Sequence, residues 1–155
     1  MIRELKNGNS QSEGDFMRIM AIDYGDAHTG IAISDPTGFL AGFTTTIDAY
    51  RPEAVAERIA ALAAEHGVEE LVLGHPINMD GTRGPRSEKA QAMAELLRQT
   101  TSLPVVLWDE RRTTIDAHQI LFNSGKNAKK RKKVVDAVAA SLILEGYLTL
   151  SLIHI

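Results

Sequence analysis

The amino-acid sequence predicts an α/β fold in which helices flank a five-stranded mixed sheet. Three short apolar runs, at 18–23, 29–34 and 41–47, are separated by turn-forming residues and predict an antiparallel meander. The later apolar runs alternate with segments of helical period, which indicates parallel strands joined by crossover helices. With 155 residues, of which 44% are hydrophobic and 24% charged, the chain has the size and composition of one globular domain.

The first strand is expected to carry the residue around which the site is built. Its apolar run ends on Asp23, and Gly25 then breaks the run. The turn-like segment 26–29 predicts a hairpin with the second strand. A carboxylate beside a core is costly unless something compensates its charge, and a metal ion is one such compensation. The alternative interpretation is that Asp23 only caps a turn.

After residue 50 the hydrophobic period changes from two to about 3.6. Pro52 stands at a first helical position, and Gly67 ends the helix. Turn formers fill a loop at 75–84, and a capping-box pattern starts another helix near Thr113. The expected helices are 52–66, 85–99, 113–123 and 133–147, and the expected strands are 68–74 and 103–108.

The composition excludes several classes of protein. No cysteine is present, which excludes disulfides and thiolate chemistry and fits a cytoplasmic protein. No apolar run is long enough to span a bilayer. We expect residues 1–16 to be a disordered extension or translation upstream of a start at Met17, residues 17–150 to form the domain, and 151–155 to be a short tail.

One segment is strongly basic. Six positive charges fall within 126–133, and without them the formal net charge of −3 would be −9. Such a run predicts a phosphate-binding element, and a solvated loop or helix start is the alternative. The nucleic-acid contacts expected from this run are Lys129, Lys130, Arg131, Lys132 and Lys133.

Carboxylates follow two strands that are expected to be neighbours. Asp23 ends the first strand and Asp109-Glu110 ends the fifth, so Asp23 and Glu110 should meet where the strand order reverses. Asp136 is expected in the first turn of the last helix, on the face of its small apolar residues. A first-turn carboxylate favoured by the helix dipole is the alternative for Asp136.

Clustered carboxylates favour Mg²⁺ or Mn²⁺, and two such ions can activate water for phosphodiester cleavage. The leading hypothesis is therefore a metal-dependent nuclease that acts on nucleic acid. One alternative is a nucleic-acid-binding factor without catalysis. Another is an ATPase of the actin and sugar-kinase type, which would need a second domain of this kind.

Four motifs together resemble the bacterial YqgF family, also called RuvX. The first opens with Asp23-Tyr24-Gly25 and runs to Asp35, and the second is the loop from Gly74 to Thr82. The third starts at Trp108-Asp109-Glu110-Arg111, and the last runs from Lys129 to Ala140. They occur in order across about residues 17–148.

The resemblance implies a ribonuclease H-like fold and a nuclease that matures the 5′ end of pre-16S ribosomal RNA in ribosome biogenesis. Resolution of Holliday junctions is the older proposal for the family. The resemblance assigns catalytic and metal-binding roles to Asp23, Glu110 and Asp136. Asp109 is a neighbour without an assigned role.

Substrate contacts are expected elsewhere on the domain. Asn78 and Asp80 match the central loop of the family, and Arg111 follows Glu110 directly, where it can contact phosphate. His28 and His75 depart from the family pattern, without loss of any carboxylate. The expected partner is precursor RNA or branched DNA, bound by a monomer or a homodimer.

Overall fold

The structure is a computed structural model that describes residues 17–37, 41–78, 80–110 and 128–153, with side chains of the last helix described for 137–150. The chain forms five strands and three helices in these ranges. Their order is β1 (Ile19–Asp23), β2 (His28–Ser34), β3 (Ala41–Asp48), α1 (Pro52–His66), β4 (Glu70–His75), α2 (Pro85–Thr100), β5 (Val105–Asp109) and α4 (Ala128–Ile153).

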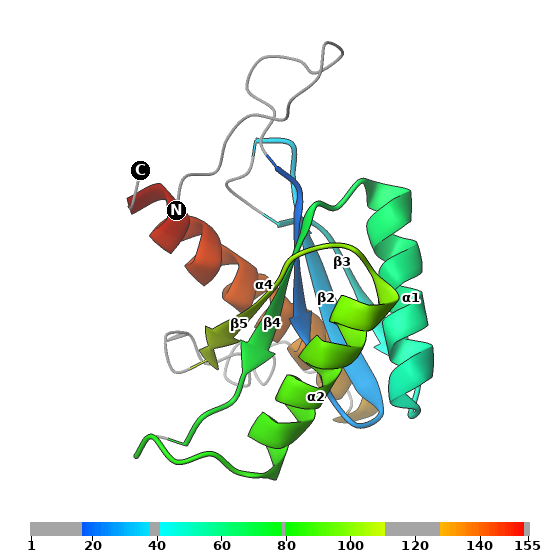
Figure 1. Cartoon of the computed structure of the whole chain (residues 1–155), viewed down its shortest axis with the longest axis vertical. Coiled ribbons are helices and arrows are strands. Elements are labelled where there is room, and N and C mark those ends of the chain that lie inside the picture. Colours follow the sequence, from blue (N-terminus) through cyan, green and yellow to red (C-terminus); the bar gives the residue numbers. More distant parts are fainter. Residues whose placement is uncertain (1–16, 38–40, 79, 111–127, 154–155) are drawn as a thin grey trace.

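The five strands form one mixed sheet in the order β3-β2-β1-β4-β5 (Figure 1). β1 pairs antiparallel with β2 on one side and parallel with β4 on the other, and β4 pairs parallel with β5. The predicted meander and the predicted parallel crossovers are therefore confirmed. The point at which the strand direction reverses lies at β1, as predicted.

Local sequence signals set the ends of the first two helices. Pro52 and Pro85 each stand at the start of a helix, where the missing N–H of proline costs nothing. α1 ends at Gly67, whose left-handed φ of 67° lets its N–H reach the carbonyls of Ala63 and Ala64. The expected bounds of both helices agree with the structure to within one residue.

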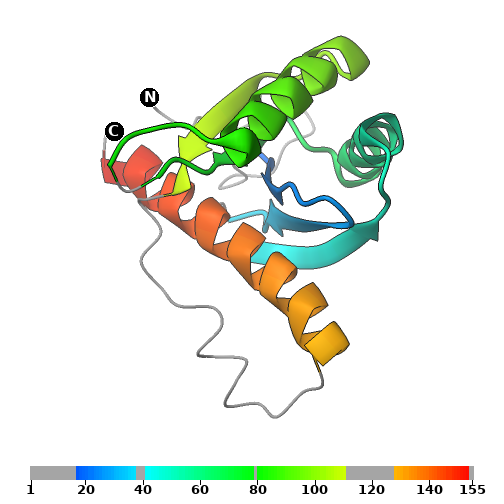
Figure 2. The ribbon, with the colours of Figure 1, turned by 90° about the horizontal axis from the view of Figure 1, so that it is seen from below.

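Helices cover both faces of the sheet, and strand alternation divides the core between them (Figure 2). α1 and α2 cover one face, which is lined by large side chains. These are Met20, Ile22, Ile31, Ile33, Leu71 and Leu73. α4 covers the other face, where the strands present Ile19, Ala21, Ala32, Val72 and Trp108. We call these the α1/α2 face and the α4 face.

The last helix differs from the prediction at both ends. α4 spans Ala128–Ile153, whereas the sequence predicted 133–147. The basic run was interpreted as a segment before the helix, but lysine and arginine are good helix formers and residues 128–133 are helical. Asp136 therefore lies in the third turn, and its expected place in the first turn was wrong.

Leu148 is buried against the sheet, which extends the packed part of α4 beyond the expected end. The helix predicted at 113–123 lies outside the described residues, as does the N-terminal segment 1–16. Within the described ranges, no helix has the length and apolar character needed to cross a membrane.

Candidate active site

Asp23 occupies the α4 face at the carboxyl end of the central strand. Ile19 and Ala21 pack in the core beneath α4, and side chains alternate along a strand, so Asp23 is the next residue on that face. Its side chain is only partly buried, unlike the four residues before it. Asp23 pairs with Gly30 of β2, which leaves space beside the carboxylate on that strand.

Glu110 reaches the same face from the end of β5. A Cβ atom built on Gly74 of β4 would lie 2.5 Å from Glu110 Oε1 and 2.7 Å from Ile143 Cδ1 of α4. The Glu110 carboxylate therefore rests on the bare backbone of Gly74, beneath α4. Glycine is needed here because any larger side chain would occupy the place of the carboxylate.

The sheet register brings Asp23 and Glu110 to opposite sides of Gly74. Ile22 pairs with Leu73, so Asp23 follows in register beside Gly74. Adjacent strands lie about 4.8 Å apart. Two carboxylates thus flank one glycine on the α4 face, at the edge of the sheet where the prediction placed them.

Asp109 belongs to the opposite face. It pairs with His75 at the ends of β5 and β4, and Val105 and Leu107 before it pack on the α1/α2 core. Asp109 and Glu110 are adjacent in sequence, but Glu110 lies on the α4 face. Strand alternation thus places these two acids on opposite faces of the sheet, a separation that was not predicted from the sequence.

His75 anchors the first turn of α2 to the end of β4. Its Nε2 lies 2.7 Å from Ser87 Oγ and 3.3 Å from Gln91 Nε2. Because the Gln91 amide nitrogen can only donate, His75 Nε2 accepts from it, which places the ring proton on Nδ1. Burial, followed by the positive charge of Arg83, lowers the pKa of His75, so the ring is neutral at pH 7.

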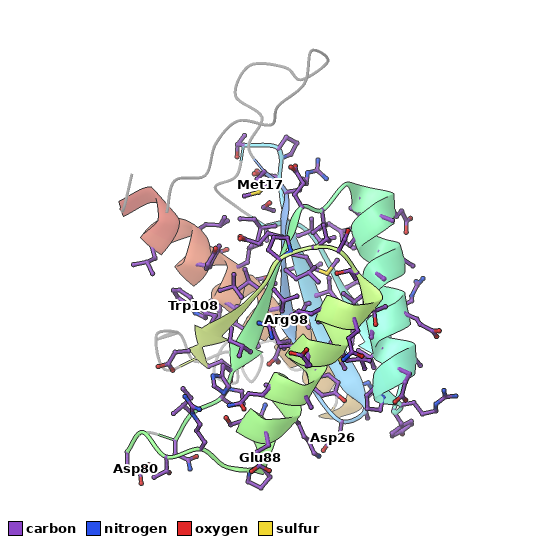
Figure 3. The ribbon with its side chains drawn as sticks, viewed as in Figure 1. Met17, Asp26, Asp80, Glu88, Arg98 and Trp108 are labelled. Atoms are coloured by element: carbon purple, nitrogen blue, oxygen red, sulfur yellow. The ribbon has the colours of Figure 1, made fainter. Side chains whose placement is uncertain are left out.

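The loop between β4 and α2 is held by its own hydrogen bonds. Asn78 Nδ2 donates to Thr82 Oγ1 at 2.9 Å, and that hydroxyl donates to Asp80 Oδ1 at 2.6 Å. These hydrogen bonds from Thr82 lower the pKa of the exposed Asp80 carboxyl. Asn78 and Asp80, expected to contact substrate, thus also shape the loop, which projects below the sheet in Figure 3.

Most of the remaining expected residues belong to α4. Asp136 is one turn before Ala140 and two turns before Ile143, both buried against the sheet, so its helical position continues that face. Residues 129–133 occupy the first two turns of α4. Arg111 lies outside the described residues. Among the described side chains, no three His, Cys, Asp or Glu residues gather as a metal site, and Asp136 is not among those side chains.

The comparisons with known proteins agree with this architecture. Residues 17–150 match the family model described as RuvX, Holliday junction resolvase. The chain belongs to the RuvX family. A relative from Halothermothrix orenii named "Putative pre-16S rRNA nuclease" is 46% identical over 132 residues, covering 85% of this chain and 94% of the relative. A relative of the same name from Listeria innocua is 46% identical over 134 residues, covering 85% and 97%.

Among solved structures, RuvC from Thermus thermophilus in complex with a Holliday junction substrate has a similar fold. The TM-score is 0.58 at 14% sequence identity, and the match covers 86% of this chain and 96% of RuvC. At this identity the likeness concerns the fold, and it confirms the predicted ribonuclease H-like class.

Sequence reasoning missed the residues that support the carboxylates of this RuvX chain. Gly74 was noted only as the start of a motif, and Ile143 was given no role. The approach of Glu110 and Ile143 to Gly74 depends on how α4 crosses the sheet, and the sequence does not encode that angle in a local pattern. Counting alternate residues back from Glu110 to Trp108 and Val106 was the one available signal for its face.

Proposed function

We propose that this RuvX protein is a metal-dependent nuclease that hydrolyses phosphodiester bonds in the 5′-end maturation of pre-16S ribosomal RNA. The observation that carries the proposal is the pair of carboxylates, Asp23 and Glu110, on either side of Gly74 at the carboxyl edge of the sheet. The match extends over nearly the whole length of both relatives, and their name, "Putative pre-16S rRNA nuclease", supports an RNA substrate.

The residues present fit a divalent cation of the Mg²⁺ or Mn²⁺ type. Carboxylate oxygens are the ligands such ions prefer, and the bare Gly74 leaves room for the Glu110 carboxylate beside Asp23. Asp23 and Glu110 would hold the cations, with Asp136 of α4 as the third ligand. When bound, the ions supply activation of water and stabilisation of the leaving oxygen.

The chain itself supplies position and charge. Asp23 is positioned by the central strand, and the Glu110 carboxylate rests against the backbone of Gly74. The basic residues at 129–133 attract the phosphate backbone toward the start of α4. No side chain of this set needs to act as a nucleophile, because water attacks the phosphorus.

The test is a cleavage assay on a 5′-extended 16S rRNA precursor fragment, with Mg²⁺, with Mn²⁺ and with EDTA. Wild type is expected to cut in either metal and not in EDTA. Asp23→Asn is expected to lose about three orders of magnitude in rate, because about 4 kcal/mol of charge stabilisation is lost. Its thermal melting should match that of wild type, since Asp23 lies partly exposed at a strand end. Equal cutting by Asp23→Asn would contradict the proposal.

Junction resolution is the second candidate, and the match to the resolvase family model and to the RuvC fold favours it. A four-way DNA junction in the same assay separates the two functions. If only the junction is cut, the substrate is branched DNA and the proposed RNA substrate is wrong. Metal-independent binding with no cutting of either substrate would indicate a non-catalytic factor.

A further inference from the structure

We propose that Arg83 and Arg86, at the start of α2, form a second contact for the nucleic-acid backbone, across the carboxylates from the basic start of α4. The proposal rests on the nuclease function proposed above, and it adds the direction in which the substrate crosses the molecule. Neither arginine belongs to the basic run that the sequence singled out.

Both arginines are exposed on an ordered support. Arg83 immediately precedes Gly84, the residue before α2, and Arg86 lies in the first turn of that helix. The hydrogen bond of 2.7 Å between His75 and Ser87 ties this turn to the end of β4. The Asn78–Thr82 hydrogen bond closes the loop that leads to Arg83.

The two cations lie beside the carboxylate edge. Ser87 of the first turn of α2 is hydrogen-bonded to His75 at the end of β4, so the start of α2 lies where the strands end. The charges of Arg83, Asp109 and Glu110 all act on His75. The charge of Arg86 acts in turn on Lys89, one turn further along α2. Arg83 and Arg86 therefore place two exposed positive charges at the start of α2, close to the carboxyl ends of the strands.

The neighbouring charges leave these two arginines available. Lys89 Nζ lies 2.7 Å from Asp26 Oδ1, so that lysine is already engaged. Asp80 accepts hydrogen bonds from Thr82 within its own loop. Within the part of the chain that the structure describes, Arg83 and Arg86 form no ion pair with an acidic side chain.

The arrangement spans both sides of the sheet. α2 covers one face and α4 the other, and the carboxyl ends of β1 and β4 lie between them (Figure 2). Guanidinium groups suit phosphate oxygens, which accept paired N–H donors. A strand bound at both helix starts would pass over Asp23 and Glu110, where its phosphodiester bond can be cut.

The experiment measures binding without cleavage. The probes are a labelled RNA hairpin and the same sequence as a single strand, titrated in EDTA over a range of salt concentrations. The variants are Arg83→Gln, Arg86→Gln and the double variant. The matched control is Arg58→Gln with Arg98→Gln, which removes the same charge from exposed positions on α1 and at the far end of α2.

The double variant is expected to raise the Kd by about tenfold at low salt, as for two exposed charge contacts. The slope of log Kd against log salt should fall by about one for each arginine. The control should keep the wild-type slope, and thermal melting checks that all variants fold. If the double variant and the control bind alike, or if wild type binds neither probe, the inference is overturned. If wild type binds these probes but cuts nothing in the cleavage assay described above, the nuclease function is refuted, whereas the arginine contact is not.

Discussion

The two faces of the sheet are built differently, although the same five strands make both. The α1/α2 face is filled with large aliphatic side chains and a buried His75. On the α4 face the strands present smaller residues, such as Ala21 and Ala32, and at the carboxyl edge the bare Gly30 and Gly74. The first face supplies a core, and the second leaves room for carboxylates beneath a helix.

This difference shows how one strand serves stability and chemistry together. Within β1, Met20 and Ile22 pack on α1 and α2, whereas Ile19, Ala21 and Asp23 face α4. A change at Asp23 is therefore separated by strand alternation from the larger core. Mutations on the α4 face at this edge should alter cleavage more than folding, and those on the other face should do the reverse.

Among substitutions that leave every carboxylate in place, the largest effect is expected from Gly74→Ala. The new methyl group would meet Glu110 Oε1 and Ile143 Cδ1, at 2.5 Å and 2.7 Å. A displacement of the carboxylate by about 1 Å can cost about a hundredfold in rate. Crowding of Ile143 should cost about 1–3 kcal/mol of stability. Cleavage rate and urea denaturation measure the two effects.

A second substitution separates these effects. Adding Ile143→Val to Gly74→Ala should recover stability but not activity, because the methyl group still displaces Glu110. Gly67→Ala is the control. Its φ of 67° should make the substitution cost about 1–2 kcal/mol of folding stability, although nothing lies within 4 Å of the new Cβ. Cleavage should be unchanged. Wild-type cleavage by Gly74→Ala would show that Glu110 needs no such support.

A smaller effect is expected from Tyr147→Phe, at the end of the α4 face away from the site. The Tyr147 hydroxyl donates to the buried Glu70 Oε1 at 2.9 Å, and its ring packs edge-on against Trp108. Loss of that donor should cost about 1–3 kcal/mol in urea denaturation, with cleavage preserved. Ser141→Ala is the control, because Ser141 bonds only to Ala137 O within the helix in the described structure. Equal stability of the two variants would mean that the Glu70 contact does not anchor α4.

The smallest effect is a pH dependence on the α1/α2 face. Burial lowers the pKa of His75 below its usual value of about 6.5, so the unfolded chain takes up a proton before the folded one. Stability from this group is present above pH 6.5 and is lost as the pH falls below it. Thermal melting between pH 8 and about pH 5 should show this loss in wild type and a flatter curve in His75→Gln. A profile unchanged by the substitution would place the titration elsewhere.

The sequence predicted the order of the elements and the carboxyl edge because both depend on local signals. Proline and glycine set the ends of α1, and apolar runs marked every strand. The start of α4 was missed because the run of like charge was interpreted as a phosphate-binding segment before the helix, although lysine and arginine are good helix formers. The support of Glu110 by Gly74 and the hydrogen bond between His75 and Ser87 arise from packing between distant parts of the chain, which no local pattern reports.

The measurement that tests the account most directly compares two adjacent acids. Glu110→Gln and Asp109→Asn remove one charge each, from the α4 face and the α1/α2 face respectively. Rates of precursor RNA cleavage are measured in Mg²⁺ and Mn²⁺, together with thermal melting. Glu110→Gln is expected to lose about three orders of magnitude in rate, whereas Asp109→Asn should stay within about tenfold of wild type. Equal losses in the two variants, or a greater loss in Asp109→Asn, would contradict the assignment of the site to the α4 face.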